Sequence, residues 1–102
     1  MELIAHMLGA ALLVNSVPHT VQGVSGKPFQ TPFASPPGIG LSPPSTNALW
    51  GGANAIAGIL LLFGVGELEV GLDLHTTLVL GAGLLAAFGL ARYFERLADR
   101  LP

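Results

Sequence analysis

Long apolar stretches alternate with shorter polar ones along the chain. The clearest is "ALWGGANAIAGILLLFGVG", residues 48–66, in which Asn54 is the one strongly polar side chain. A second, "LHTTLVLGAGLLAAFGLA", residues 74–91, gathers its polar members at its first end. Each is close to the roughly 20 residues that a helix needs to cross a hydrocarbon core of ~30 Å. Both stretches are therefore predicted to be transmembrane helices.

The N-terminal stretch is less uniform. "LIAHMLGAALLV" is apolar apart from His6, but its continuation "NSVPHTVQGV" is mixed, so it spans a membrane only if both halves are helical. A cleaved signal peptide is the competing interpretation, but the chain starts Met1-Glu2 without a basic residue and "LLVNS" lacks a small-x-small cleavage pattern. We expect an all-α membrane protein with three transmembrane helices, over residues 2–23, 46–65 and 74–97, that form a single domain from 1 to 102.

Proline dominates the long connection between the first two helices. Residues 25–45, "SGKPFQTPFASPPGIGLSPPS", are rich in proline and glycine, and proline removes backbone donors and disfavours helical geometry in the residue before it. Ser42, Pro43 and Pro44 are expected to form the N-cap and first turn of the next helix. An ordered loop at the membrane interface, anchored by Phe29 and Phe33, is the favoured interpretation. A surface that docks a partner and a plain connector are the alternatives.

Composition agrees with a membrane protein. Of 102 residues, 10% are charged and 51% are hydrophobic, a balance typical of chains that live in lipid. Only four residues are basic, so the cluster of cations that nucleic-acid binding requires is missing. The chain has no cysteine, which excludes disulfides, thiolate metal sites and thiol nucleophiles. The expected partners are the lipid bilayer and either a second copy of the chain or another membrane protein.

Charge predicts the orientation. Lys27 follows the first helix, and three further bases follow the apolar part of the third: Arg92, Arg96 and Arg100. The connection "ELEVGLD", residues 67–73, has three acids and no base. By the positive-inside rule, the N-terminus is expected outside and the C-terminus in the cytoplasm, with Trp50 and Tyr93 at the cytoplasmic interface. In "RYFERLADR" two oppositely charged pairs stand at i, i+3, which predicts that the helix continues into water: Arg92 with Glu95 and Arg96 with Asp99.

One segment resembles a known family. The run "NSVPHTVQGVSGKPFQTPFASPPGIGLSPPSTNALWG", residues 15–51, contains Pro18-His19, "SGKPF", "TPFA", "PPGIGLS" and "NALWG". These motifs resemble those of an uncharacterised family of small bacterial integral membrane proteins. The resemblance covers about a third of the chain. It implies a protein of the bacterial inner membrane, and it supplies no catalytic residue.

Polar residues within the first two helices form a candidate intramembrane cluster. Its members fall at helical spacing on one face of each helix: Asn15, His19 and Gln22, and then Asn47 and Asn54, which alternate with Gly51 and Gly58. Glycine lets helix backbones approach, and the amides can then bond between helices. The favoured interpretation is hydrogen bonding that holds the helices together. The alternative is a small polar pocket with His19 as a proton acceptor or ligand.

Small residues also mark the third helix. Ala82, Ala86 and Gly89 are expected to pack against another helix, within the protomer or between protomers. His6 and His75 are both expected near the outer surface, close to Glu2 and Asp73. A metal site there lacks a firm third ligand, so hydration of the two rings is favoured.

Few residues of the chain indicate a function. No carboxylate lies within an apolar stretch, which disfavours proton-coupled transport. No spacing indicates a catalytic residue, a metal site or a cofactor. Haem or quinone binding at His19 beside Trp50 is disfavoured, because only one histidine is placed to be an axial ligand. An enzyme is therefore not favoured. We expect a structural, accessory or oligomerising membrane subunit; the alternative is a small channel or carrier formed by oligomerisation around the polar cluster.

Overall fold

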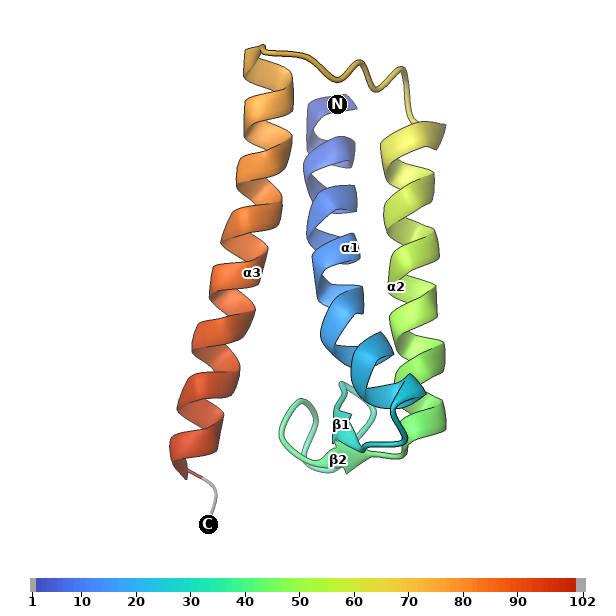
Figure 1. Cartoon of the computed structure of the whole chain (residues 1–102), viewed down its shortest axis with the longest axis vertical. Helices are drawn as coiled ribbons and strands as arrows, with labels where there is room; N and C mark the ends of the chain where they lie inside the picture. The colour runs from blue at the N-terminus through green and yellow to red at the C-terminus, as the bar shows by residue number, and fades with distance from the viewer. Residues whose placement is uncertain (1, 101–102) are drawn as a thin grey trace.

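Three antiparallel helices make up most of the chain. The computed structural model describes residues 2–100, with the elements α1 (Glu2–Val24), β1 (Phe29–Gln30), β2 (Leu41–Ser42), α2 (Pro44–Gly64) and α3 (Leu74–Arg100). Figure 1 shows the helices side by side with α1 in the middle and the β1–β2 loop at one end. The prediction of an all-helical chain is confirmed, and each of the three helices is long and apolar enough to cross a membrane.

The start of α2 differs from the prediction. The helix begins at Pro44, and Pro43 holds the N-cap position with extended backbone angles (φ −60°, ψ 158°) and no side-chain cap. The expectation that Ser42 would be the N-cap was wrong. Ser42 instead pairs with Phe29 in the short antiparallel ladder of β1 and β2, and its hydroxyl is hydrogen-bonded to that of Thr31. Since Pro43 and Pro44 carry no backbone N–H, fewer donors remain at this helix start to be capped.

The end of α1 is set by glycine. Gly26 has a φ of 74°, a left-handed conformation that glycine adopts without steric cost. The reversed chain then donates from the backbone nitrogen of Lys27 to the carbonyl of Gln22 at 2.9 Å, which closes the helix. Pro18 lies inside α1, and the C-terminal part of this helix turns towards α2 (Figure 1). A bend is the usual consequence of an interior proline.

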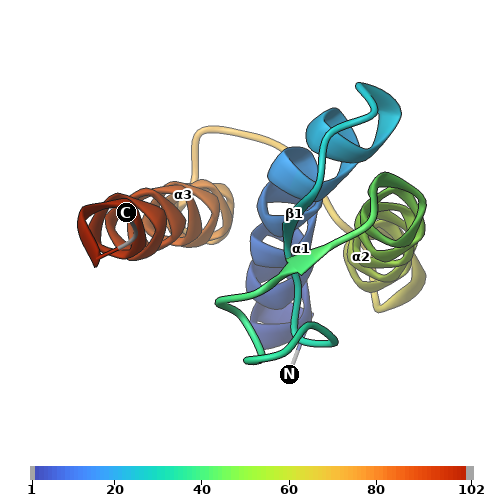
Figure 2. The ribbon, with the colours of Figure 1, turned by 90° about the horizontal axis from the view of Figure 1, so that it is seen from below.

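Both outer helices pack on α1 and leave their far faces open. α1 lies between α2 and α3, which occupy opposite sides of it (Figure 2). Only a few large apolar side chains are buried, namely Leu62, Val79 and Leu97. Many others are exposed along α2 and α3: Ile56, Leu60, Phe63, Leu80, Leu84 and Phe88. Exposed apolar surface of this extent is unusual in a soluble monomer and suits a lipid environment.

Candidate functional site

Asn47 joins the start of α2 to the loop. Its side chain is fully buried, and Nδ2 lies 3.0 Å from the carbonyl oxygen of Phe29, 3.1 Å from that of Ser42 and 3.3 Å from that of Pro43. The amide nitrogen donates and the carbonyl oxygens accept. The side chain of Asn47 is therefore oriented with Nδ2, and not Oδ1, towards the three carbonyls. Asn47 therefore ties α2 to both short strands at once.

The same amide fixes the state of His19. The Nδ1 atom of His19 lies 2.9 Å from Oδ1 of Asn47. Since Oδ1 only accepts, Nδ1 carries the hydrogen, and the neutral ring keeps a free electron pair on Nε2. The ring is 5% exposed and meets the ring of Phe29 edge to face, with centroids 5.4 Å apart. His19 is thus held by its helix, by α2 and by the loop.

A second contact between α1 and α2 lies farther from the loop. Asn15 donates from Nδ2 to Oδ1 of Asn54 at 3.0 Å, and Asn54 donates from Nδ2 to the carbonyl of Trp50 at 2.9 Å. Bonds between membrane helices average about 0.6 kcal/mol each. We call Asn15, His19, Asn47 and Asn54 the polar seam. The side chains of all four form hydrogen bonds within the chain.

Glycine makes these short bonds possible. A Cβ atom at Gly51 would meet the hydroxyl of Thr20 and lie 2.7 Å from its backbone nitrogen, and one at Gly58 would lie 2.7 Å from the carbonyl oxygen of Gly9. The backbones of α1 and α2 are therefore in direct contact. The complementary small residues of α1 were not singled out from the sequence, although they recur every seven positions: Gly9, Ser16 and Gly23.

A small cavity adjoins the polar seam. It has a volume of about 150 Å³ and is lined by residues that include Asn15, His19, Trp50, Tyr93 and Phe94. Tyr93 and Gly38 both line the cavity, and the hydroxyl of Tyr93 donates a hydrogen bond to the carbonyl of Gly38. The Nδ1 atom of His19 is already bonded to Asn47. Nε2 is therefore the ring nitrogen that can bond to a molecule in this cavity. The site can accept a hydrogen bond from a water molecule, and the cavity has room for several.

The remaining candidates lie outside the polar seam. Gln22 is half-buried, and its backbone carbonyl accepts the bonds that end α1. On α3, Ala82 and Ala86 are half-buried, and Gly89 is exposed with no atom within 4 Å of its Cβ position. The glycine of α3 that approaches α1 is Gly83, whose Cβ position lies 3.6 Å from Val14. Contact of Gly89 with another protomer stays a prediction.

His6 and His75 meet at the opposite end of the helices. His6 is fully buried; its Nε2 lies 2.7 Å from the carbonyl oxygen of Val65, and its Nδ1 lies 2.8 Å from Nε2 of His75. The carbonyl only accepts, so the neutral His6 carries its hydrogen on Nε2 and accepts from His75 on Nδ1. The expectation of two hydrated rings was wrong for His6, because it is used to join α1, α3 and the end of α2. Within residues 2–100, no group of three or more metal-binding side chains is arranged to hold an ion.

Charged side chains gather at the two ends of the helices. A cleft of about 500 Å³ at one end is lined by four acids and His75: Glu2, Glu67, Glu69 and Asp73. Asp73 accepts from the backbone nitrogen of Thr76 at 2.8 Å, and this bond is the main reason that the pKa of Asp73 lies below its ordinary value. At the other end Arg92 pairs with Glu95 at 2.9 Å. Among the described residues this is the one ion pair, so the expected pair of Arg96 and Asp99 does not form.

Comparison with known proteins does not assign a family. No family model, no curated protein and no solved structure matches this chain. The resemblance of residues 15–51 to a bacterial membrane family therefore stays a prediction.

Proposed function

We propose that this chain is a multi-pass membrane protein that acts as a structural or accessory subunit, with the loop of residues 25–43 as its docking surface. One observation carries the proposal: the amide of Asn47 contacts three carbonyls of the loop and its flank and the ring of His19. These bonds satisfy the carbonyl groups and hold the loop in one conformation. A fixed loop loses little conformational entropy on binding, which favours recognition by a partner.

The orientation follows from the separation of charge. α1 ends, α2 begins and α3 ends at the pole that contains the loop, and this pole holds all four basic residues of the chain, Lys27 and the three arginines of α3. The opposite pole holds the acidic cleft. The positive-inside rule then places the loop and the C-terminal end of α3 in the cytoplasm and the start of α1 outside. The resemblance of residues 15–51 supports the bacterial inner membrane as the location.

The partner is expected to be another membrane protein or a second copy of the chain. Support comes from α3, which among the helices packs mainly on α1 and leaves many of its large apolar side chains exposed. Within a bilayer, such a face contacts either lipid or another helix. The small side chains of Ala82 and Ala86 would allow a helix to approach it closely.

A small carrier or channel is the second candidate, and the cavity beside His19 favours it. In that case, Nε2 of His19 would bind the transported species. Reconstituted vesicles would show a flux that His19→Ala abolishes. Against this candidate, the amides of the polar seam bond to one another and to backbone carbonyls, which leaves few of them to line a path.

The docking proposal is tested by capture from membranes. A tagged full-length chain is solubilised in mild detergent and its stoichiometric partners are identified. Asn47→Ala removes the anchor of the loop and should abolish capture, as should replacement of residues 28–42 by a Gly/Ser segment of equal length. Asn54→Ala is the matched control, because it removes an amide of the polar seam that does not touch the loop. Capture that survives both loop variants would refute the proposal.

A further inference from the structure

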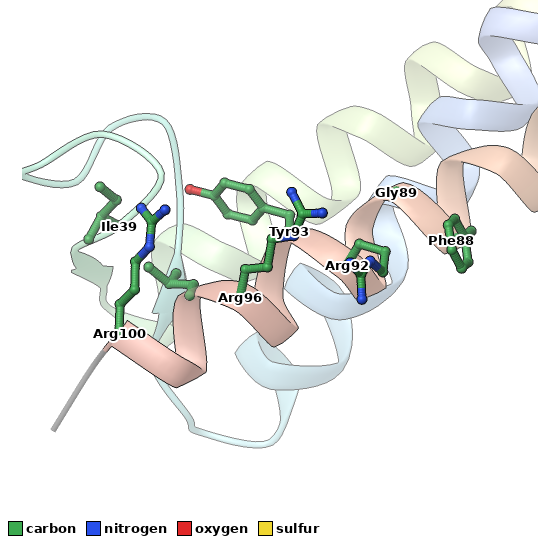
Figure 3. Close-up of a pocket in the computed structure, with 8 residues that line it drawn as sticks. Ile39, Phe88, Gly89, Arg92, Tyr93, Arg96 and Arg100 are labelled. Atoms are coloured by element: carbon green, nitrogen blue, oxygen red, sulfur yellow. The ribbon is translucent and has the colours of Figure 1, made fainter.

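One groove collects most of the positive charge of the chain. The chain has four basic residues, and three of them line a groove of about 530 Å³ between the end of α3 and the loop: Arg92, Arg96 and Arg100. They stand at i, i+4 and i+8, so they share one side of α3. Figure 3 shows Arg100 reaching up beside Ile39 of the loop. In a chain with so few charges, this concentration indicates an anionic ligand.

The rest of the groove is apolar. Phe88, Leu97 and Ile39 line it together with Tyr93, whose bond to the loop carbonyl of Gly38 holds that wall in place. Gly89 lies between Phe88 and Arg92 and leaves open space. The groove therefore offers cationic side chains towards the end of α3 and an apolar channel towards its middle.

We propose that this groove binds an anionic phospholipid, with the phosphate held by Arg96 and Arg100 and an acyl chain lying over Gly89 against Phe88. Arg92, whose Nη1 atom pairs with Glu95, adds positive charge between Gly89 and Arg96. The assignment rests on the proposed membrane location. Guanidinium groups match phosphate oxygens in paired hydrogen bonds. The direction of the groove fits a lipid, because its apolar part points into the proposed span and its arginines lie at the cytoplasmic interface, where anionic headgroups attract basic residues.

Two pairs of variants separate this site from general attraction between charges. Arg96→Gln removes a cation that lines the groove, whereas Lys27→Gln removes a cation of the same pole that does not line it. Gly89→Leu fills the apolar channel without changing any charge. Gly81→Leu is its control, because Gly81 also lies on α3 with no atom within 4 Å of its Cβ position and lies outside the groove.

The full chain in detergent is titrated with short-chain phosphatidylglycerol, with phosphatidylcholine and with inorganic phosphate. Native mass spectrometry counts the bound molecules of each ligand. We expect phosphatidylglycerol to bind more tightly than the other two. Arg96→Gln should weaken it about fivefold, the effect of one basic residue near an anionic surface. Gly89→Leu should weaken phosphatidylglycerol alone, while Lys27→Gln and Gly81→Leu should change little.

Three outcomes would overturn the inference. If Arg96→Gln and Lys27→Gln weakened phosphatidylglycerol binding equally, the lipid would be attracted by the positive charge of the whole pole and not by the groove. Phosphatidylglycerol bound no more tightly than inorganic phosphate, with no effect of Gly89→Leu, would assign a site for free anions. Equal affinity for phosphatidylcholine would leave the arginines without a role. Membrane insertion and partner capture are measured on the same variants, so a failure of the lipid site is distinguishable from a failure of the proposed function.

Discussion

The contact at Gly51 gives the sharpest test of how α1 and α2 are joined. In Gly51→Ala the new Cβ would lie 2.7 Å from the backbone nitrogen of Thr20 and 3.1 Å from the carbonyl oxygen of Ser16. Ordinary contacts begin at 3.4 Å, so the helices must separate by about 0.7 Å (3.4 − 2.7) at this point. Both neighbours are backbone atoms and cannot rotate away. The bond of 3.0 Å between Asn15 and Asn54, one turn along α2, would lengthen to roughly 3.7 Å and be lost.

The expected cost follows from these two effects. Overpacking of a tight contact costs about 1–3 kcal/mol, and the lost bond between helices adds about 0.6 kcal/mol. We therefore expect Gly51→Ala to lower the free energy of unfolding by about 2–4 kcal/mol, and Gly51→Leu to lower it further. Gly52→Ala is the matched control, because no atom lies within 4 Å of that Cβ position. It should be neutral or stabilise by about 0.5–1 kcal/mol through helix propensity.

The assay is reversible unfolding in mixed detergent micelles, followed by far-UV circular dichroism, on the two alanine variants. Crosslinking is an independent readout, since the chain contains no cysteine. Asn15→Cys with Asn54→Cys should crosslink within one protomer, and the added Gly51→Leu should prevent it. Equal stability of Gly51→Ala and Gly52→Ala would refute the close contact of the backbones. Crosslinks that form only between protomers would move the polar seam to an oligomer interface and favour the channel.

Two further predictions concern the opposite end of the helices. The pKa of Asp73 is lowered in the folded chain, so its stabilisation of α3 is present above the unfolded value and is lost as the pH falls below about 4. The protection of the Thr76 amide against hydrogen exchange, corrected for the intrinsic pH dependence of exchange, should fall in that range. Asp73→Asn should remove this pH dependence while keeping a cap, and a pH profile unchanged by Asp73→Asn would contradict the assignment. His6→Ala should lower the free energy of unfolding by about 2–4 kcal/mol, because it leaves a void where the ring is fully buried and unpairs the carbonyl of Val65. Since His75 is only half-buried, His75→Ala should cost less in the same denaturation assay, and the reverse order would argue against the central position of His6.

The sequence predicted what depends on local pattern. The lengths of the apolar stretches predicted three helices, and the helical spacing of Asn47, Gly51, Asn54 and Gly58 placed these residues on the face of α2 that is buried in the structure. Contacts between distant segments could not be predicted in this way. Spacing along α2 gives no sign that the amide of Asn47 reaches the carbonyl of Phe29, because that bond depends on how the loop folds back.

The structure at the ends of the helices was predicted only in part. A serine before two prolines is a common helix start, but the pairing of Ser42 with Phe29 in β2 took precedence over capping. His6 and His75 were correctly assigned to one end, yet their direct contact depends on the rotation of α1 and α3 about their axes. The apolar pattern does not fix that rotation when both helices are apolar nearly all round.

The central claim is that the chain crosses the membrane with the loop and the acidic connection on opposite sides. Two single-cysteine variants test it most directly, Ser35→Cys in the loop and Glu69→Cys in the connection, both at exposed positions. Intact spheroplasts are treated with a membrane-impermeant maleimide, and lysed membranes provide the reference for full labelling. We expect position 69 to be labelled in intact cells and position 35 to be labelled only after lysis. Labelling of both positions in intact cells, or of position 35 alone, would contradict it.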